Sequence, residues 1–248
     1  MADANKLKRF RLSSGKPNSF TLVELLVVVS IIGLLAALAV PVTKKAIASG
    51  KTGKATGNLR QIGVLVNSYA AENQNRLPLS REANLGSSPE DFAFFQNYLR
   101  MNAKLPYKTN WKTGKDPWLP DIFYDPIVKK GRQHPWGCFG LNHAIVLSYD
   151  DNIKGGTPLS IIQPLSGKVI VASSKVSKDP TWDSSWLFEG KQFAADGTNS
   201  SFGQPDPRHH GKALCLFADG HVEALAVGNM TSLERERYFM QDPTWTKY

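Results

Sequence analysis

Hydrophobic residues form one long uninterrupted run near the N-terminus. Residues 22–40 read LVELLVVVSIIGLLAALAV and contain a single ionisable side chain, that of Glu24. A run of this length matches the number of helical residues that cross the hydrocarbon core of a bilayer. The pattern therefore predicts a membrane-spanning helix over residues 22–40.

After Pro41 the apolar positions take the spacing of a helix with one buried face. They lie three or four residues apart, at Ala55, Leu59, Ile62, Val66 and Tyr69. One long helix is therefore expected over residues 20–74. Pro41 removes a backbone donor, and four glycines each weaken a helix by up to about 1 kcal/mol relative to alanine. The second half of the helix is expected to be locally soft at these positions: Gly50, Gly53, Gly57 and Gly63.

Residues 75–248 have the shorter pattern of one domain with many turns. Ser88 and Pro89 precede an apolar helical face and predict the cap and first turn of a short helix. Residues 144–147 and 168–172 are apolar, rich in β-formers and bounded by turn residues, so each is predicted to be a strand. The overall prediction is an α+β fold.

The clearest local pattern of this domain covers residues 213–226. Two strand-like runs flank Asp219 and Gly220 there. Asp-Gly between such runs predicts a β-hairpin with a type I′ turn, in which both central residues have positive φ. Further on, Thr231 and Glu234 have the spacing of a capping box at the start of a final short helix.

The distribution of charge bears on the kind of partner. The formal net charge is +9, but the basic residues cluster in residues 1–19 and 43–60, on both sides of the apolar run. Cations in these places meet anionic lipid head groups. The chain beyond Arg60 is close to neutral, so a nucleic-acid partner is not expected. Because both flanks are basic, charge alone does not set the orientation of the span.

The two cysteines, Cys138 and Cys215, are far apart in the sequence. They lack the paired spacing of a zinc ribbon or a redox motif, so a thiolate metal site is not expected. Two interpretations remain open. The cysteines form one disulfide if the domain lies outside the cytoplasm, or they are two buried free thiols.

The stretch around Glu24 places a carboxylate where lipid makes a charge costly. It consists of Phe20, Thr21, Leu22, Val23, Glu24, Leu25 and Leu26. This stretch resembles the processing signal of type IV pilins and of the pseudopilins of type II secretion. The resemblance implies that residues 1–19 are a cytoplasmic leader and that a prepilin peptidase cleaves between Ser19 and Phe20. It further implies that the new amine of Phe20 is methylated and that Glu24 guides filament assembly.

Ser19 departs from the family, which usually has glycine before the cut. Serine is also small, so cleavage is expected, at a lower rate. The alternative is an ordinary secretory signal peptide, for which residues 37–39, Ala-Leu-Ala, offer a signal peptidase site. A separate alternative concerns Glu24 alone: it has no assembly role, and its carboxylate only extends to the membrane interface.

The family resemblance implies a pilin-like fold, in which a long N-terminal helix packs on a C-terminal antiparallel β-sheet. It also implies a single-pass protein of the bacterial inner membrane with its C-terminal domain in the periplasm. The implied partners are the prepilin peptidase, other pilin or pseudopilin subunits, the inner-membrane assembly platform and the lipid bilayer.

A second resemblance lies near the C-terminus. His209, Asp219 and Gly220 form an H-x9-D-G element, similar to the one at the C-terminus of a large group of prepilin-like proteins. The role of its histidine is not established. His209, His210, Asp219 and His221 are also plausible ligands for zinc if the hairpin brings them together. Histidines and aspartates at turns more often satisfy backbone groups, so no metal is predicted there.

Calcium is a further possibility at residues 196–206, which are rich in oxygen-bearing side chains but lack EF-hand spacing. No cofactor is expected, since the sequence has no H-E-x-x-H helix, nucleophile elbow or P-loop. Two hypotheses follow. The first is a structural subunit of a filament, which is not an enzyme. The second is a membrane-anchored periplasmic metal-dependent enzyme or carbohydrate-binding module that uses the histidine region or the tryptophan-rich loops.

Overall fold

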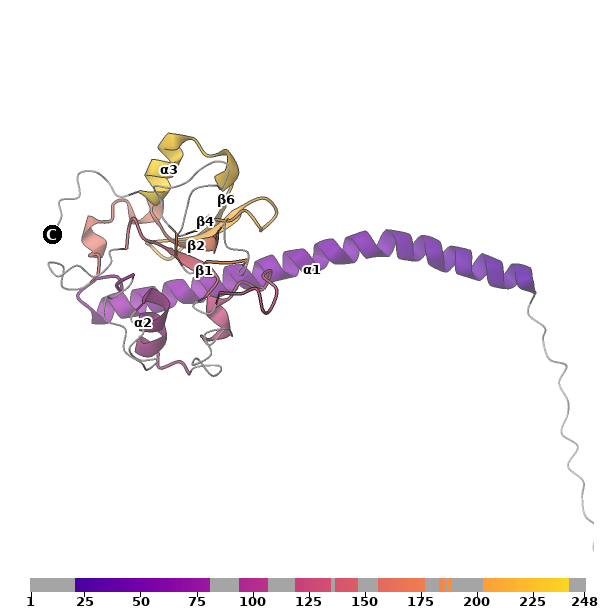
Figure 1. Ribbon diagram of the computed structural model, residues 1–248, viewed down its shortest axis with the longest axis horizontal. Helices are drawn as coiled ribbons and strands as arrows, with labels where there is room; N and C mark the ends of the chain where they lie inside the picture. Colours follow the sequence, from indigo (N-terminus) through magenta and orange to yellow (C-terminus); the bar gives the residue numbers. More distant parts are fainter. Residues whose placement is uncertain are drawn as a thin grey trace, which may run out of the picture. The chain divides into compact units, whose positions relative to one another are not determined.

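The structure is a computed structural model that describes residues 21–80, 94–106, 119–134, 137–146, 156–176, 183–185, 187–188 and 203–240. The chain divides into two compact units, Met1–Ile47 and Ala48–Tyr248. Helix α1 (Leu22–Glu72) contributes its first half to one unit and its second half to the other (Figure 1). The helix expected over residues 20–74 is thus present, and it continues through Pro41.

The first half of α1 exposes an apolar surface. Its large hydrophobic side chains between residues 22 and 42 are 46–81% exposed. Within the described residues, α1 is the one helix long and apolar enough to cross a membrane, judged by length and composition. So much exposed apolar surface requires a bilayer or other helices to cover it, because water does not solvate it favourably.

The second half of α1 forms part of the core of the globular unit. The predicted stripe is buried from Ala55 to Val66, and Tyr69 is half-buried beside it. Residues three and four apart lie on one face of a helix, so this spacing presents a continuous apolar surface to the sheet. Burial of the stripe therefore fixes which face of α1 the sheet covers.

The sheet of the globular unit is almost wholly antiparallel. Its strands follow the order β3-β1-β2-β5-β6, with β4 paired to the end of β2, and only the β1–β3 pair is parallel. The strands are β1 (Phe139–Asn142), β2 (Val169–Lys175), β3 (Leu187–Phe188), β4 (Gln204–Pro205), β5 (Ala213–Phe217) and β6 (Val222–Leu225). A long N-terminal helix followed by this sheet confirms the predicted α+β fold.

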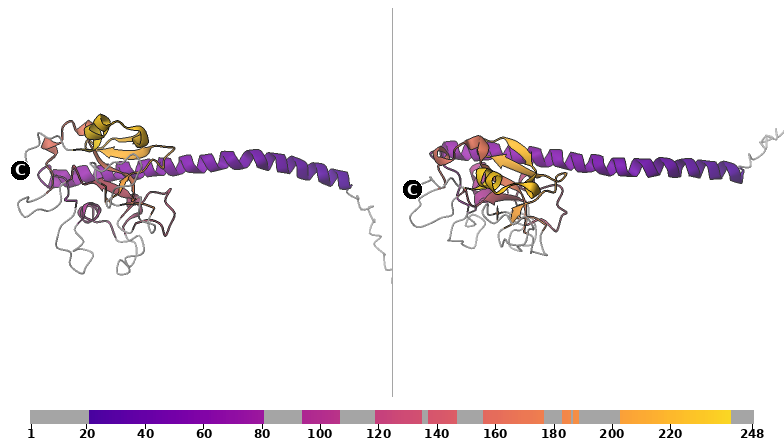
Figure 2. Two further views of the ribbon diagram at one scale, coloured as in Figure 1. Left: turned by 45° about the horizontal axis from the view of Figure 1, so that its top comes forward. Right: turned by 90° about the horizontal axis from the view of Figure 1, so that it is seen from above.

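Helices cover the two faces of the sheet. Leu214 and Leu216 of β5 join the cluster that contains the α1 stripe and α2 (Phe95–Asn102). The alternate residues Cys215 and Phe217 belong to a second cluster with α3 (Ser232–Phe239). Successive strand residues point to opposite faces, so β5 contributes to both clusters. Figures 1 and 2 show α3 on the side of the sheet away from α1.

The two predicted strands before the hairpin have different outcomes. The prediction at residues 168–172 is confirmed by β2. The prediction at residues 144–147 is wrong, because residues 143–146 form a turn and the strand β1 precedes them. The side chain of Asn142 explains the turn. Its Oδ1 accepts a hydrogen bond from the N–H of Ala144, while its Nδ2 donates to the carbonyl of Val169.

The predicted capping box of the last helix is confirmed. Thr231 Oγ1 accepts from the N–H of Glu234, and the Glu234 carboxylate accepts from the N–H of Thr231 at the start of α3. The cap predicted at Ser88 and Pro89 lies outside the described residues. Residues 119–134 consist of turns and one short 3-10 helix, Asp121–Phe123.

The disulfide considered for Cys138 and Cys215 is not formed. Both thiols are free and buried. Cys138 belongs to the cluster on the α1 side of the sheet and Cys215 to the cluster on the α3 side. Burial raises the pKa of Cys138 to about 11, and it raises the pKa of Cys215 as well. Both cysteines therefore behave as small core residues.

The predicted hairpin is present, but its turn differs from the predicted type. Gly220 N–H donates to the carbonyl of Phe217, and Phe217 N–H donates to that of His221. Gly220 has φ 92°, whereas Asp219 is not among the described residues with positive φ. A type I turn followed by one glycine in the left-handed region has this pattern. The loop is one residue longer than a type I′ turn would allow.

This turn lies directly against α1. A methyl group added at Gly63 would lie 3.0 Å from Cδ1 of Leu216 and 3.3 Å from the carbonyl oxygen of Gly220. Gly63 is therefore the position where the backbone of the hairpin approaches the helix closely. A methyl group added at Gly53, in the same helix, would have nothing within 4 Å.

These two glycines form a matched pair for testing the contact. Gly53→Ala is expected to raise the free energy of unfolding by up to about 1 kcal/mol, because alanine favours the helix. Gly63→Ala is expected to be less stable than Gly53→Ala by about 1–3 kcal/mol, because the methyl group overpacks the contact with the hairpin. Urea unfolding of the full chain in detergent micelles measures both values. Equal stabilities would contradict the close approach at Gly63.

Candidate functional site

Two groups of residues that the sequence singles out have a defined geometry. The first is at the start of α1, where Thr21 and Glu24 form a reciprocal pair. The backbone N–H and the Oγ1 of Thr21 donate to Oε2 of Glu24 at 2.9 and 2.8 Å. The N–H of Glu24 in turn donates to Oγ1 of Thr21 at 3.2 Å. This is a capping box, which satisfies backbone donors at the beginning of a helix.

The capping box gives Thr21 a role that the sequence analysis missed. The spacing Thr-x-x-Glu at residues 21–24 is the same signal that was recognised at residues 231–234. The box directs the carboxylate of Glu24 toward the N-terminal end of the helix. Leu22 and Val23, between the two partners, are exposed, and the predicted cleavage residues Ser19 and Phe20 lie outside the described residues.

The second group is centred on the buried imidazole of His209. Nε2 lies 2.9 Å from Oδ2 of Asp125, and both side chains have 0% exposure. Nδ1 lies 3.2 Å from Oγ1 of Thr52 in α1. His209 therefore links α1 to the loop that carries Asp125.

Further contacts hold this loop in place. Oδ1 of Asp125 accepts from the N–H of Ile127 at 2.9 Å. Asn58, about 1.7 turns beyond Thr52 in α1, donates from Nδ2 to the carbonyl of Tyr124 at 3.1 Å. Asn58 thus holds Tyr124 directly, and Thr52 is connected to Asp125 through His209.

A tight turn places His209 at this position. His209 and Lys212 exchange both backbone hydrogen bonds, at 3.0 and 3.1 Å. His210 and Gly211 between them have φ 52° and 81°. Positive φ at both central residues is the type I′ pattern. The type I′ turn predicted for Asp219 and Gly220 occurs instead at His210 and Gly211.

The other end of the H-x9-D-G element is the hairpin turn at the far end of β5. Oδ1 of Asp219 accepts from the N–H of His221 at 3.1 Å and lies 2.6 Å from Nδ1 of the same residue. A Cβ atom at Gly220, which has positive φ, would lie 3.1 Å from Nδ2 of Asn67 in α1. Asp219 therefore stabilises the turn locally, and Gly220 allows it to approach the helix.

The element accordingly brackets β5 and contacts α1 at both ends. Along the helix, the interval from Thr52 to Gly63 and Asn67 is about 17–22 Å at 1.5 Å per residue. Along the strand, the interval from Lys212 to Ala218 is about 20 Å at 3.3 Å per residue. The two lengths match. The nine-residue spacing thus lets one end dock near Thr52 and the other near Gly63.

The four weak metal candidates do not assemble into one site. His221 lies at the opposite end of β5 from His209 and His210, so the hairpin separates these ligands. Among the described residues, no group of three or more histidine, cysteine, aspartate or glutamate side chains is arranged to hold a metal ion. Most of the calcium candidate at residues 196–206 lies outside the described residues, and Asp206 pairs with Arg208.

Thr52, His209 and Asp125 have the residue types of a hydroxyl, imidazole and carboxylate triad. The imidazole and the carboxylate are both fully buried, however. A substrate carbonyl has no surface from which to reach the imidazole. This geometry suits a structural link between segments of the chain.

The comparisons with known proteins bear on the first group of residues, at the start of α1. The family model described as the prokaryotic N-terminal methylation motif matches residues 16–40. No curated protein matches the chain. No solved structure matches it either. The chain carries the prepilin-type signal, and together with the long apolar helix this indicates a type IV pilin-like or pseudopilin-like precursor. Such precursors are usually structural and non-enzymatic.

The buried pair of His209 and Asp125 can be tested against the exposed pair of His221 and Asp219. His209→Ala would leave the carboxylate of Asp125 buried without its main partner, which is expected to cost about 3–5 kcal/mol. His221→Ala, at the exposed turn, is expected to cost less than about 1 kcal/mol. Chemical denaturation of the two full-length variants measures the difference. Similar losses for both would show that the buried link contributes no more than the exposed one.

Proposed function

We propose that this protein is a structural subunit of a type II secretion or type IV pilus-like filament. In this proposal a prepilin peptidase removes residues 1–19, the amine of Phe20 is methylated, and the subunit joins its neighbours through α1. The observation that carries the proposal is the methylation motif at residues 16–40, which includes a lone carboxylate in an apolar, exposed helix.

The surface of α1 supports assembly through this helix. A span of this kind is covered by lipid before assembly and by neighbouring helices afterwards, since both are apolar. In the proposed topology the leader lies in the cytoplasm and the globular unit in the periplasm, with a single pass through the bacterial inner membrane. The partners are then the peptidase, other subunits of the filament and the inner-membrane assembly platform.

The hydrogen bonds of Glu24 favour a charged partner from a neighbouring subunit. Both bonds from Thr21 go to Oε2, and Oε1 accepts none from the described residues. A carboxylate in an apolar environment is stabilised by an opposite charge. A methylated amine keeps its positive charge, so the Phe20 amine of a neighbouring subunit can pair with Glu24. Such a pair would set the axial stagger between adjacent helices.

The processing step predicts the mass of the mature chain. Mass spectrometry of the protein purified from membranes is expected to find a methylated Phe20 at the N-terminus. Ser19→Gly is expected to be cleaved faster than the wild type in a pulse-chase experiment, and Ser19→Leu to remain uncleaved, because the cut requires a small side chain. A mature terminus at Val40 would instead assign the segment to ordinary signal peptidase and refute the proposal.

Two variants test the charge of Glu24 and its role in the helix cap independently of each other. Glu24→Gln keeps a side chain that completes a capping box but removes the charge. It is expected to be cleaved and inserted yet absent from filaments. Thr21→Val keeps the charge and removes the hydroxyl of the cap, so it is expected to assemble. Both are measured by the filament fraction sheared from cells.

The contrary results of this experiment are equally specific. Wild-type assembly by Glu24→Gln would show that the charge is not needed. Loss of assembly in Thr21→Val alone would show that the helix cap, not the carboxylate charge, is the requirement.

A further inference from the structure

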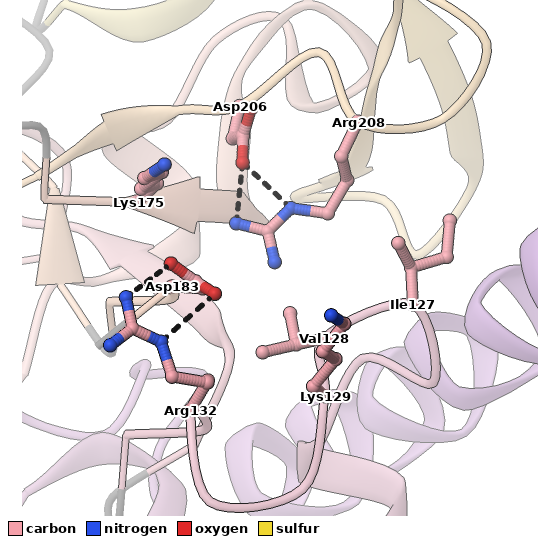
Figure 3. A pocket seen from close by; sticks show the side chains of 8 residues that line it. All are labelled: Ile127, Val128, Lys129, Arg132, Lys175, Asp183, Asp206 and Arg208. Atoms are coloured by element: carbon pink, nitrogen blue, oxygen red, sulfur yellow. Dashed lines mark hydrogen bonds and ion pairs between the residues drawn. The ribbon is translucent and has the colours of Figure 1, made fainter. Parts of the chain in front are cut away.

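A charged cavity lies on the globular unit beside the buried pair of His209 and Asp125. It has a volume of about 380 Å³. Three segments form most of it: the loop after Asp125, the end of β2 and the residues before His209 (Figure 3). Its lining residues are Ile127, Val128, Lys129, Arg132, Lys175, Asp183, Asp206 and Arg208.

Both carboxylates of the cavity are already paired with arginines. Arg132 donates from Nε and Nη2 to the two oxygens of Asp183, at 3.1 and 3.0 Å. Hydrogen bonds from Arg132 lower the pKa of Asp183, so this carboxylate stays ionised at neutral pH. Arg208 donates from Nε to Oδ2 of Asp206 at 2.8 Å, and its Nη2 lies 2.6 Å from the same oxygen.

Two lysine amines add positive charge that these pairs do not balance. No hydrogen bond or ion pair within the described part of the chain involves the amine of Lys129 or of Lys175. The cavity lining thus carries four cations and two anions. A site with this excess of positive charge favours a ligand with two negative charges.

Arg208 provides a fixed donor for such a ligand. Its side chain is only 9% exposed. Nη2 also donates to the carbonyl of Ser174 at 2.9 Å, which holds the guanidinium in one orientation. The remaining nitrogen, Nη1, points into the cavity in Figure 3 and lies 4.0 Å from Asp125, too far for a hydrogen bond. This nitrogen is therefore oriented before any ligand binds.

We propose that the cavity binds a doubly charged tetrahedral oxyanion, either free phosphate or a phosphate ester. A planar carboxylate is best bound by the fork of an arginine, but both forks are occupied by aspartates. Nη1 of Arg208 and the amines of Lys129 and Lys175 are donors that make no hydrogen bond within the described residues. These donors belong to three different side chains around one cavity, which suits the several oxygens of a phosphate. The apolar side chains of Ile127 and Val128 leave room for the organic part of an ester.

The experiment uses the full chain in an uncharged, phosphate-free detergent. Isothermal titration with inorganic phosphate and with glucose 6-phosphate is expected to give saturable binding, and titration with acetate is expected to give none. Lys129→Ala with Lys175→Ala is expected to weaken phosphate binding about 10-fold or more. The matched control, Lys51→Ala with Lys54→Ala, makes the same change in net charge at two exposed positions of α1.

Each outcome decides a specific point. Tighter binding of glucose 6-phosphate than of inorganic phosphate would assign the site to an ester, and the reverse order to the free ion. Equal weakening by the cavity and control variants would overturn the proposal, because binding would then follow net charge alone. Binding of acetate as tight as that of phosphate would also overturn it. All four lysines are at least partly exposed, so the variants are expected to fold.

Discussion

Packing of the apolar stripe of α1 against the sheet is the constraint on which the globular unit depends. Leu59, Ile62 and Val66 are buried in the same cluster as Leu214 and Leu216 of β5. Strand residues alternate between the two faces of a sheet. Because the two leucines face α1, Cys215 and Phe217 face α3. The contact of one helix with one strand thus determines the arrangement of both layers.

The H-x9-D-G element reinforces this contact at both ends of β5. Its histidine is buried against α1 and a carboxylate, and its glycine permits the hairpin turn to approach α1. The element therefore provides two contacts with α1, one at His209 and one at Gly220, and the length of β5 sets the distance between them. This explains in structural terms why a histidine, a spacer and an Asp-Gly turn occur together here.

Patterns with a regular period predicted their elements from the sequence, because they depend on local geometry alone. The long helix, β2, the hairpin and the capping box of α3 all follow from spacing or from turn chemistry within a few residues. The strand at residues 144–147 was wrong because the side chain of Asn142 bonds to β2 and turns the chain, a contact no local pattern contains. The turn type was wrong because Ala218 is part of the loop.

The two groups around Glu24 and His209 were found from the sequence, but their geometry was not. The partners of His209 are Thr52 and Asp125, which lie 157 and 84 residues away in the chain. No spacing rule links such distant positions. The capping box at Thr21 was different. Its signal, the Thr-x-x-Glu spacing, lies within four residues and could have been recognised from the sequence. The anionic preference of the cavity depends on which carboxylates pair with which arginines, and only the folded chain determines this.

The position of the two cysteines has a consequence for how the folded protein can be observed. Each thiol is buried in the cluster on one face of the sheet, and burial keeps the pKa of Cys138 near 11. A thiolate forms only when its own layer opens, so the native chain carries one chemical reporter for each side of the sheet. Separate labelling rates for Cys138 and Cys215 would reveal whether the α1 layer and the α3 layer open together or one at a time.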